Sequence, residues 1–235
     1  MISYVFERFE LKYLLTPEQY RIMKAAADER LRPDEFGETT IQSLYFDTPD
    51  YRLVRASLEG PVYKEKLRVR CYGMNDDDRN VYIEMKRKSE GVVYKRRISC
   101  KEPEGLALFG GSFPDTQIGR ELDYFRRIYE GIGPRILILS ERAAFFDPES
   151  DLRVTFDTGI RYRTTDLNFH TSAAGTDIIP PGYALMELKA GASYPLWLCR
   201  LLSDNNICKR SFSKIGAAYV HKFYTEQNSR SYTNV

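Results

Sequence analysis

The chain has 235 residues, 43% of them hydrophobic and 13% aromatic, so it can bury one sizeable core or at most two small ones. Its 35 lysines and arginines nearly balance its 33 aspartates and glutamates, and a formal net charge of +2 does not by itself imply a polyanionic partner. Its apolar runs fall short of the roughly 20 residues of a membrane span, its first residues lack a signal-peptide pattern, and its two histidines argue against a His-based triad. We therefore expect a cytoplasmic protein without a membrane segment of its own.

The first third of the chain is predicted to alternate strands with helices. Residues 6–14 alternate polar and apolar side chains, which is typical of a strand. Thr16-Pro17-Glu18-Gln19 forms a capping box with Pro at the first helical position, and it predicts a helix to about Leu31. A strand over 41–47 follows. A second helix is expected to start at Thr48-Pro49 and to end at Gly60.

Three consecutive strands are predicted at 63–72, 81–88 and 92–100. The links between them are short, which favours antiparallel neighbours. The first link, 73–80, contains three aspartates, and we interpret it as a solvated turn rather than a metal site.

The second half contributes the remaining elements of a predicted α+β fold. We expect a helix over 119–130, strands at 135–145, 151–157, 160–163 and 183–189, a polar loop at 164–182, and helices beginning near Pro195 and Ser213. About eight antiparallel strands with one polar and one apolar face favour a closed eight-stranded barrel with helices packed on its outside. We expect one domain over 1–226 and a polar tail over 227–235.

The strand predicted at 63–72 carries a row of cations on one face. Alternate side chains of a strand point the same way, which separates the cations Lys64, Lys66, Arg68 and Arg70 from the apolar Leu67, Val69 and Cys71. Four cations in a row repel one another unless an anion lies against them. For any single strand, the alternative is an ordinary solvated face of a half-buried sheet.

One feature of the polar faces points to phosphate and metal chemistry. The pattern Glu-x-Lys occurs at Glu10/Lys12, Glu84/Lys86 and Glu187/Lys189, and on a strand it places a carboxylate beside an ammonium group. Such carboxylates can hold a hard divalent cation, while the cationic side chains bind phosphate oxygens. The sequence has no Gly-rich phosphate loop, so phosphate binding would have to come from side chains that converge across strands.

The chain resembles the polyphosphate polymerase (vacuolar transporter chaperone, VTC) domain of the CYTH-like triphosphate tunnel metalloenzymes. The segments that carry the resemblance occur in the family's order: RFELKY (8–13), SLYFDTPD (43–50), KLRVRCYG (66–73), VYIEMKRK (81–88), VYKRRIS (93–99), ERAAFF (141–146), LRVTFD (152–157), LMELKAG (185–191) and FSKIGAAY (212–219). Each segment alone is a weak signal, whereas the ordered set covers nearly the whole chain.

The resemblance implies an eight-stranded antiparallel tunnel and ATP-dependent synthesis of inorganic polyphosphate with Mn²⁺ or Mg²⁺. The positions that match the family's phosphate-binding residues are Lys12, Arg68, Arg70, Lys86, Lys95, Arg142, Arg153, Lys189 and Lys214. Glu187 matches the metal-binding position, and Glu10 and Glu84 are expected to assist it. Arg8, Lys66 and Arg97 complete the expected substrate-binding set.

Three positions depart from the related sequences. Arg8 replaces the first Glu of a Glu-x-Glu-x-Lys strand, which weakens metal binding and favours holding a long polyphosphate. Ser140 stands where the polymerases often have Tyr, and Ser211 where they have a second Lys. A metal-dependent triphosphatase of the same fold and a non-catalytic polyphosphate-binding module therefore stay as alternatives.

A nucleic-acid partner is not expected, because aromatic residues are not interleaved with the cations of the Arg68 strand. The primer, the oligomeric state and a separate membrane partner stay open.

Overall fold

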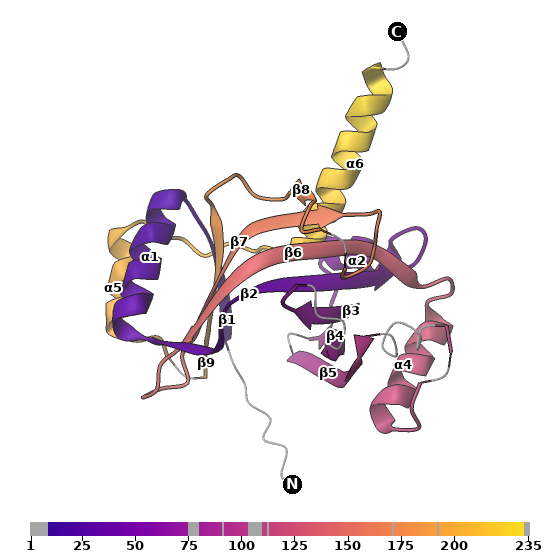
Figure 1. Cartoon of the computed structure of the whole chain (residues 1–235), viewed down its shortest axis with the longest axis horizontal. Helices are drawn as coiled ribbons and strands as arrows, with labels where there is room; N and C mark the ends of the chain where they lie inside the picture. Colours follow the sequence, from indigo (N-terminus) through magenta and orange to yellow (C-terminus); the bar gives the residue numbers. More distant parts are fainter. Residues whose placement is uncertain are drawn as a thin grey trace. The chain divides into compact units, whose positions relative to one another are not determined.

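The computed structural model describes residues 9–74, 80–90, 92–102, 110–111, 113–170, 172–191 and 193–232. Arg8 and the middle of the predicted 73–80 turn therefore lie outside the described residues. Within the described ranges the fold is α+β, with a large antiparallel sheet and five helices (Figure 1). No helix in these ranges is long and apolar enough to cross a membrane.

The elements follow one another in the chain as β1 (Phe9–Leu15), α1 (Pro17–Arg30), β2 (Arg32–Asp47), α2 (Arg52–Glu59), β3 (Tyr63–Tyr72), β4 (Asn80–Ser89), β5 (Val92–Lys101), α4 (Gln117–Ile128), β6 (Gly133–Phe146), β7 (Arg153–Arg163), β8 (Thr176–Asp177), β9 (Ala184–Ala190), α5 (Leu196–Asp204) and α6 (Lys214–Tyr232). The strand order is β1-β9-β7-β6-β2-β3-β4-β5, and β8 pairs with β7.

The chain divides into two compact units, each built from three segments. Unit 1 comprises Met1–Thr39, Ser140–Ile160 and Ile179–Phe212. Unit 2 comprises Thr40–Leu139, Arg161–Ile178 and Ser213–Val235. Strands β2, β6 and β7 contribute residues to both units. That residues 1–226 form a single domain stays a prediction.

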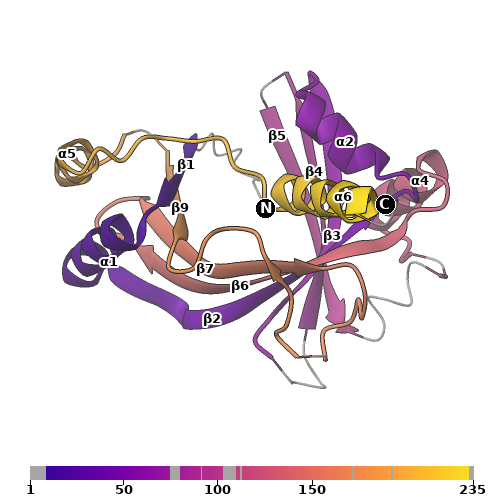
Figure 2. The same ribbon diagram turned by 90° about the horizontal axis from the view of Figure 1, so that it is seen from above.

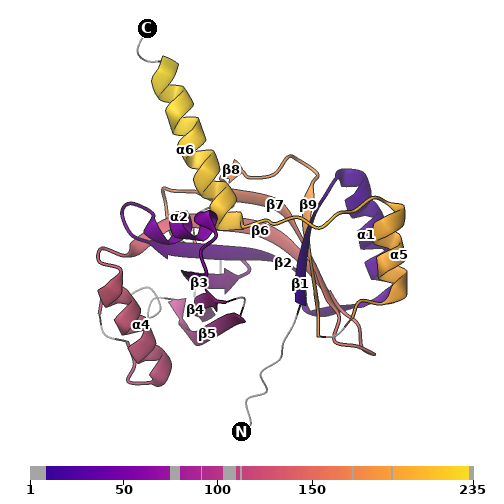
Figure 3. The ribbon, with the colours of Figure 1, turned by 180° about the vertical axis from the view of Figure 1, so that it is seen from behind.

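Helices α1 and α5 cover the apolar side of the unit 1 strands (Figure 3). The predicted capping box of α1 is confirmed: the Gln19 backbone N–H donates to Thr16 Oγ1 at 3.3 Å, and the Thr16 N–H donates to Gln19 Oε1 at 3.1 Å. Met23 of α1, Leu198 of α5 and Phe156 of β7 belong to one buried cluster. This cluster fixes the strands that carry the polar side chains of unit 1 on their other side.

Helix α4 covers the apolar side of β3 and β4 in unit 2 (Figure 2). Leu122 and Phe125 of α4 pack against the strand residues Leu67, Val69, Cys71, Val81, Ile83 and Met85. The alternation predicted for 63–72 is thereby confirmed. In β3 the buried Leu67, Val69 and Cys71 alternate with half-exposed cations. Helix α2 begins where the Asp47 carboxylate accepts hydrogen bonds from the backbone N–H groups of Leu53 and Val54, and Gly60 ends it in the left-handed conformation.

The predicted closed barrel is not what the structure contains. The sheet has two ends, β1 and β5, and among the described residues β5 pairs only with β4. Residues 92–95 of β5 are exposed, and the strand carries Lys95, Arg96 and Arg97. Charged side chains are a usual protection of an edge strand against further pairing, whereas closure needs tilt and stagger that strand alternation alone does not specify.

Several element boundaries also differ from the sequence prediction. Strand β2 begins at Arg32 rather than at 41, and the predicted strands 151–157 and 160–163 form parts of one strand, β7. β7 continues through Gly159, whose φ of 53° is one that glycine tolerates. The predicted loop over 164–182 contains the short strand β8, and α6 continues to Tyr232, beyond the predicted start of the tail.

Candidate phosphate-binding site

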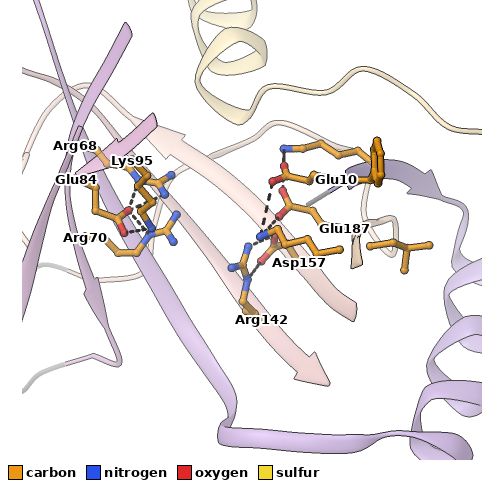
Figure 4. Close-up of polar contacts among 12 residues, drawn as sticks. Glu10, Arg68, Arg70, Glu84, Lys95, Arg142, Asp157 and Glu187 are labelled. Carbon is orange, nitrogen blue, oxygen red and sulfur yellow. Dashed lines mark hydrogen bonds and ion pairs between the residues drawn. The ribbon is translucent and has the colours of Figure 1, made fainter. Parts of the chain in front are cut away.

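Strand pairing in unit 2 aligns cations from β3, β4 and β5 on one face of the sheet (Figure 4). One cross-strand row is Lys66–Lys86–Lys95, and the next is Arg68–Glu84–Arg97. Together with Arg70 these residues form what we call the cationic face: six cations and the single carboxylate Glu84. Like charges directly opposite one another destabilise a sheet, so this row favours an anionic ligand.

Glu84 is the centre of the ion pairs on the cationic face. Its Oε2 lies 2.7 Å from Arg68 Nη2 and 3.9 Å from Arg70 Nε. Its Oε1 lies 2.6 Å from Lys95 Nζ and 3.4 Å from Arg97 Nε. Four cations from two strands therefore converge on one buried carboxylate, which fixes their direction before any ligand binds.

The pKa of Glu84 reflects this surplus of positive charge. Burial opposes ionisation of its side chain, which is 2% exposed, but Arg68, Arg70 and Lys95 outweigh burial and lower the pKa to about 2. The pKa of Lys95 is lowered, by burial and by the nearby Arg68 and Arg70, against the opposing effect of Glu84. One carboxylate thus does not neutralise the face.

The positive potential of the cationic face also lowers the pKa of two neighbouring tyrosines. Arg68 Nη1 donates to Tyr45 Oη at 3.0 Å, and Arg97 Nη2 donates to Tyr72 Oη at 3.3 Å. Burial alone would raise the pKa of Tyr45, but Arg68, Arg70 and Lys66 lower it to about 8. The pKa of Tyr72 is lowered too: burial opposes this shift, and Arg70 is its main cause.

Hydroxyl groups position two further cations of this face. Arg70 Nε donates to Ser43 Oγ at 3.2 Å, and Lys66 Nζ donates to Ser213 Oγ at 3.0 Å. Ser213 also caps α6, because its Oγ accepts from the Gly216 N–H at 3.2 Å. Lys214 is the first residue of that helix, so the start of α6 adjoins the cationic face through Ser213.

Unit 1 holds a second charged cluster on β1 and β9 (Figure 4). Lys12 Nζ lies 2.9 Å from Glu187 Oε1 and 3.3 Å from Glu10 Oε1. Lys189 Nζ lies 3.9 Å from Glu10 and 3.8 Å from Glu187. Burial opposes the charge of Lys12, but the two carboxylates outweigh it and raise its pKa. Each charge in this cluster therefore has partners of opposite sign.

Arg142 of β6 forms an ion pair with a buried carboxylate in unit 1. Its Nε and Nη2 each lie 2.7 Å from one oxygen of the fully buried Asp157. This two-bond geometry orients the guanidinium group rigidly. Arg153 of β7, by contrast, is exposed, and no described residue forms an ion pair with it.

Of the three carboxylates expected to bind a divalent metal ion, only the two in unit 1 are suited to it. Among the described residues, no group of three or more His, Cys, Asp or Glu side chains could hold a metal ion. Glu10 and Glu187 both approach Lys12, and two carboxylates suffice for Mg²⁺ when substrate phosphates and water complete the shell. Glu84 belongs to unit 2 and is engaged by four cations.

The sequence-predicted residues thus fall into two groups. Unit 2 brings together Lys66, Arg68, Arg70, Glu84, Lys86, Lys95 and Arg97, with Lys214 at the start of α6; unit 1 brings together Glu10, Lys12, Arg142, Glu187 and Lys189, with Arg153 on β7. Roles for Tyr45, Ser43 and Tyr72 in unit 2, and for Asp157 in unit 1, were not predicted from the sequence. The alternation of β2 places Tyr45 and Ser43 on the face opposite Leu44, and that signal could have found them.

Comparison with known proteins places these observations in context. A family model described as the VTC domain matches residues 7–222. A solved structure from Hippeastrum, described as an adenylyl cyclase with a dominant triphosphatase activity, is similar with a TM-score of 0.57 at 17% identity, over 92% of this chain and 96% of that chain. A Bacillus halodurans protein described as an adenylate cyclase has a TM-score of 0.54 at 14% identity, over 87% and 92%. No curated protein matches the sequence. At these identities the two structures share the fold with this chain.

Proposed function

Since this chain belongs to the VTC domain family, we propose that it is a polyphosphate polymerase that transfers the γ-phosphate of ATP to a growing inorganic polyphosphate chain. The observation that supports the proposal most is the cationic face, with six cations and one carboxylate in a chain of net charge +2. A surplus of this kind attracts a ligand with many negative charges, and a phosphate chain is the simplest one.

Arg68 and Arg70 are the central phosphate ligands in this proposal. A guanidinium group binds two phosphate oxygens in a fixed geometry, which a lysine cannot reproduce. Glu84 and Ser43 hold the two groups in place before substrate arrives, so less conformational freedom is lost on binding. Lys66, Lys86, Lys95, Arg97 and Lys214 complete the positive surface.

The proposed reaction needs no nucleophile from the protein. An oxygen of the terminal phosphate of the growing chain attacks the γ-phosphorus of ATP in line and forms the new P–O bond. The bond from the γ-phosphorus to the β,γ-bridging oxygen breaks, and ADP leaves with the electron pair. Positioning and charge neutralisation are the main contributions of a protein to such a transfer, and arginines and lysines supply both.

Unit 1 contains the side chains that suit a divalent cation. Glu187 and Glu10 would hold Mn²⁺ or Mg²⁺, which neutralises phosphate charge when bound. We propose that Glu84 organises arginines instead of binding metal, because four cations already surround it. Lys12, Arg142, Arg153 and Lys189 keep their proposed phosphate-contacting role.

A triphosphatase is the second candidate. It is favoured by the fold shared with the Hippeastrum protein, which is described as having a dominant triphosphatase activity. The same phosphate ligands would serve either reaction, because the two differ in whether a phosphate chain or water attacks. A polyphosphate-binding module without turnover is the third candidate.

Product analysis separates the three candidates. The purified chain is incubated with ATP and Mn²⁺, and the proposal predicts ADP together with an acid-labile phosphate polymer. Orthophosphate without polymer would support the triphosphatase. Binding of polyphosphate without turnover would support the binding module. Arg70→Ala should abolish product formation, while Arg21→Ala, which changes an exposed arginine of α1, should not.

A further inference from the structure

The cationic face ends in two tyrosines on the same side of the sheet. Tyr82 of β4 is paired with Arg70 of β3, and Tyr72 lies two residues beyond Arg70 on β3. Both residues are half-buried, and their rings meet edge to face, with centroids 5.7 Å apart and an interplanar angle of 79°. We call Tyr72 and Tyr82 the tyrosine pair. An aromatic surface therefore follows the rows of cations.

Arg97 of β5 lies against the tyrosine pair. Its guanidinium carbon lies over the Tyr82 ring, 3.6 Å from the ring centroid, which is a direct cation–π contact. Its Nη2 donates to Tyr72 Oη at 3.3 Å, and its Nε lies 3.4 Å from Glu84 Oε1. A ring thus covers one face of the guanidinium group while two oxygen atoms hold its edge, and these contacts fix its orientation before any ligand binds.

The opposite face of the Arg97 guanidinium group is open to solvent. The Arg97 side chain is 40% exposed, and because Tyr82 covers one of its faces, this exposure is mainly that of the other face. β5 ends the strand order, so Arg97 stands at the edge of the sheet. A planar cation held over an aromatic ring is a surface on which a nucleotide base can stack.

This stack lies within reach of the proposed phosphate ligands. Strand pairing places Arg97, Glu84 and Arg68 in one row across β5, β4 and β3. Two strand spacings, about 10 Å, separate the backbones of Arg97 and Arg68. A ribose and its first phosphate group can bridge this gap. A base on Arg97 therefore allows the remaining phosphates to reach Arg68 and Arg70.

The aromatic surface distinguishes a nucleotide from two other polyanions. A bare phosphate chain has no ring to stack, so cations alone would suffice to bind it. Single-stranded nucleic acids stack successive bases on successive rings, whereas on β3 the positions before Tyr72 carry the cations Lys66, Arg68 and Arg70. One base joined to several phosphates is the composition of a nucleoside triphosphate.

We propose that Arg97 and the tyrosine pair form the base subsite for a nucleoside triphosphate, with the base stacked on the open face of Arg97. This inference rests on the proposed function, in which ATP donates the phosphoryl group, and it adds the direction in which the donor lies. The base is at the edge strand β5, and the triphosphate crosses β4 to Arg68 and Arg70. The row Lys66–Lys86–Lys95 is left for the phosphate chain that accepts the γ-phosphate.

Comparison of two ligands tests the subsite on the full chain. The β,γ-imido analogue of ATP, which does not transfer its γ-phosphate, is titrated in parallel with tripolyphosphate, which has the phosphates but no base. Arg97→Lys keeps the charge and removes the planar group. It should weaken binding of the analogue about tenfold more than binding of tripolyphosphate, as expected for the loss of one base stack. Tyr82→Leu removes the ring beneath Arg97 and should change the ratio of the two affinities in the same direction.

Arg96→Lys is the matched control on the same strand. The Arg96 side chain is 42% exposed, much like that of Arg97, but it points to the other side of β5, where it pairs with Glu121. This variant should leave both affinities unchanged. A measurement on the wild type does not depend on how any variant folds: nuclear Overhauser effects should connect the adenine protons of the bound analogue with side-chain protons of Arg97.

The possible outcomes separate the base subsite from the phosphate site. Equal losses of the two ligands in Arg97→Lys and Tyr82→Leu would overturn the base subsite and leave the phosphate site in place. Adenine protons without contact to Arg97 at saturation would do the same. Failure of the wild type to bind either ligand would overturn the phosphate site and the base subsite together.

Discussion

The two units carry charged side chains in contrasting proportions. The cationic face of unit 2 has six cations and the single carboxylate Glu84. The polar cluster of unit 1 has the four cations Lys12, Arg142, Arg153 and Lys189 and the three carboxylates Glu10, Asp157 and Glu187. The same strand alternation thus builds one environment that needs an anion and another that largely neutralises itself.

The pKa directions differ in the same way. In unit 2 the surplus of cations lowers the pKa of the buried Tyr45 to about 8 against the effect of burial. In unit 1 Glu187 and Glu10 raise the pKa of Lys12, again against burial. A net positive potential therefore acts at Tyr45, and a net negative one acts at Lys12.

Removal of one buried, ion-paired carboxylate from each unit should show the contrast most strongly. Glu84→Gln and Asp157→Asn should each lower the free energy of unfolding by about 3 kcal/mol, because each removes the negative charge that pairs with partly buried cations. Polyphosphate should restore the melting temperature of Glu84→Gln, since phosphate replaces the lost negative charge. It should restore Asp157→Asn much less. Equal recovery of the two variants would contradict the contrast between the units.

Acid should weaken unit 2 through protonation of Glu84. The pKa of Glu84 is about 2 in the fold and 4.5 in the unfolded chain, so its contribution to stability is complete above pH 4.5 and is lost as the pH falls toward 2. The loss amounts to about 3 kcal/mol, at 1.36 kcal/mol for each pKa unit. Chemical unfolding followed over this range should show a steeper decline for the wild type than for Glu84→Gln. Parallel curves would mean that Glu84 is not held as a carboxylate.

Loss of an arginine that binds phosphate should weaken the binding of tripolyphosphate more than it lowers the free energy of unfolding. Arg70→Ala removes a charge-assisted contact of about 1.5–3 kcal/mol, which is roughly a 10- to 100-fold loss of affinity for tripolyphosphate. Titration calorimetry measures this directly. The matched variant Arg21→Ala removes an exposed arginine of unit 1 and should bind as tightly as the wild type. A similar loss in both variants would indicate attraction by overall charge alone.

The smallest expected change in binding free energy concerns Tyr45, whose ionisation should respond to bound phosphate. Tyr45→Phe removes one hydrogen bond from Arg68 and should cost about 1 kcal/mol of binding. Between pH 8 and 9, polyphosphate should reduce the tyrosinate absorbance, because bound anion raises the pKa of Tyr45 from about 8. The change should persist in Tyr72→Phe and vanish in Tyr45→Phe. An unchanged absorbance in the wild type would place the anion away from Tyr45.

Much of this arrangement could be predicted from the sequence, because strand alternation is a local property. The faces of 63–72 and the cap of α1 at Thr16 needed only residue order, and both are confirmed. The convergence of Lys95 and Arg97 on Glu84 depends on the β4–β5 register, which residue types alone do not give. The open sheet was missed for a similar reason, since closure depends on tilt and stagger. The continuity of β7 through Gly159 was missed because glycine usually marks a break.

We propose above all that the cationic face of unit 2 binds the phosphates of the substrate. Nuclear magnetic resonance of arginine side chains tests it most directly, with tripolyphosphate added to the full chain. The Nε–H signals of Arg68 and Arg70 should shift in proportion to bound ligand, while those of Arg21 and Arg120 should stay in place. Shifts confined to arginines outside the cationic face, with Arg68 and Arg70 unmoved at saturation, would contradict the account.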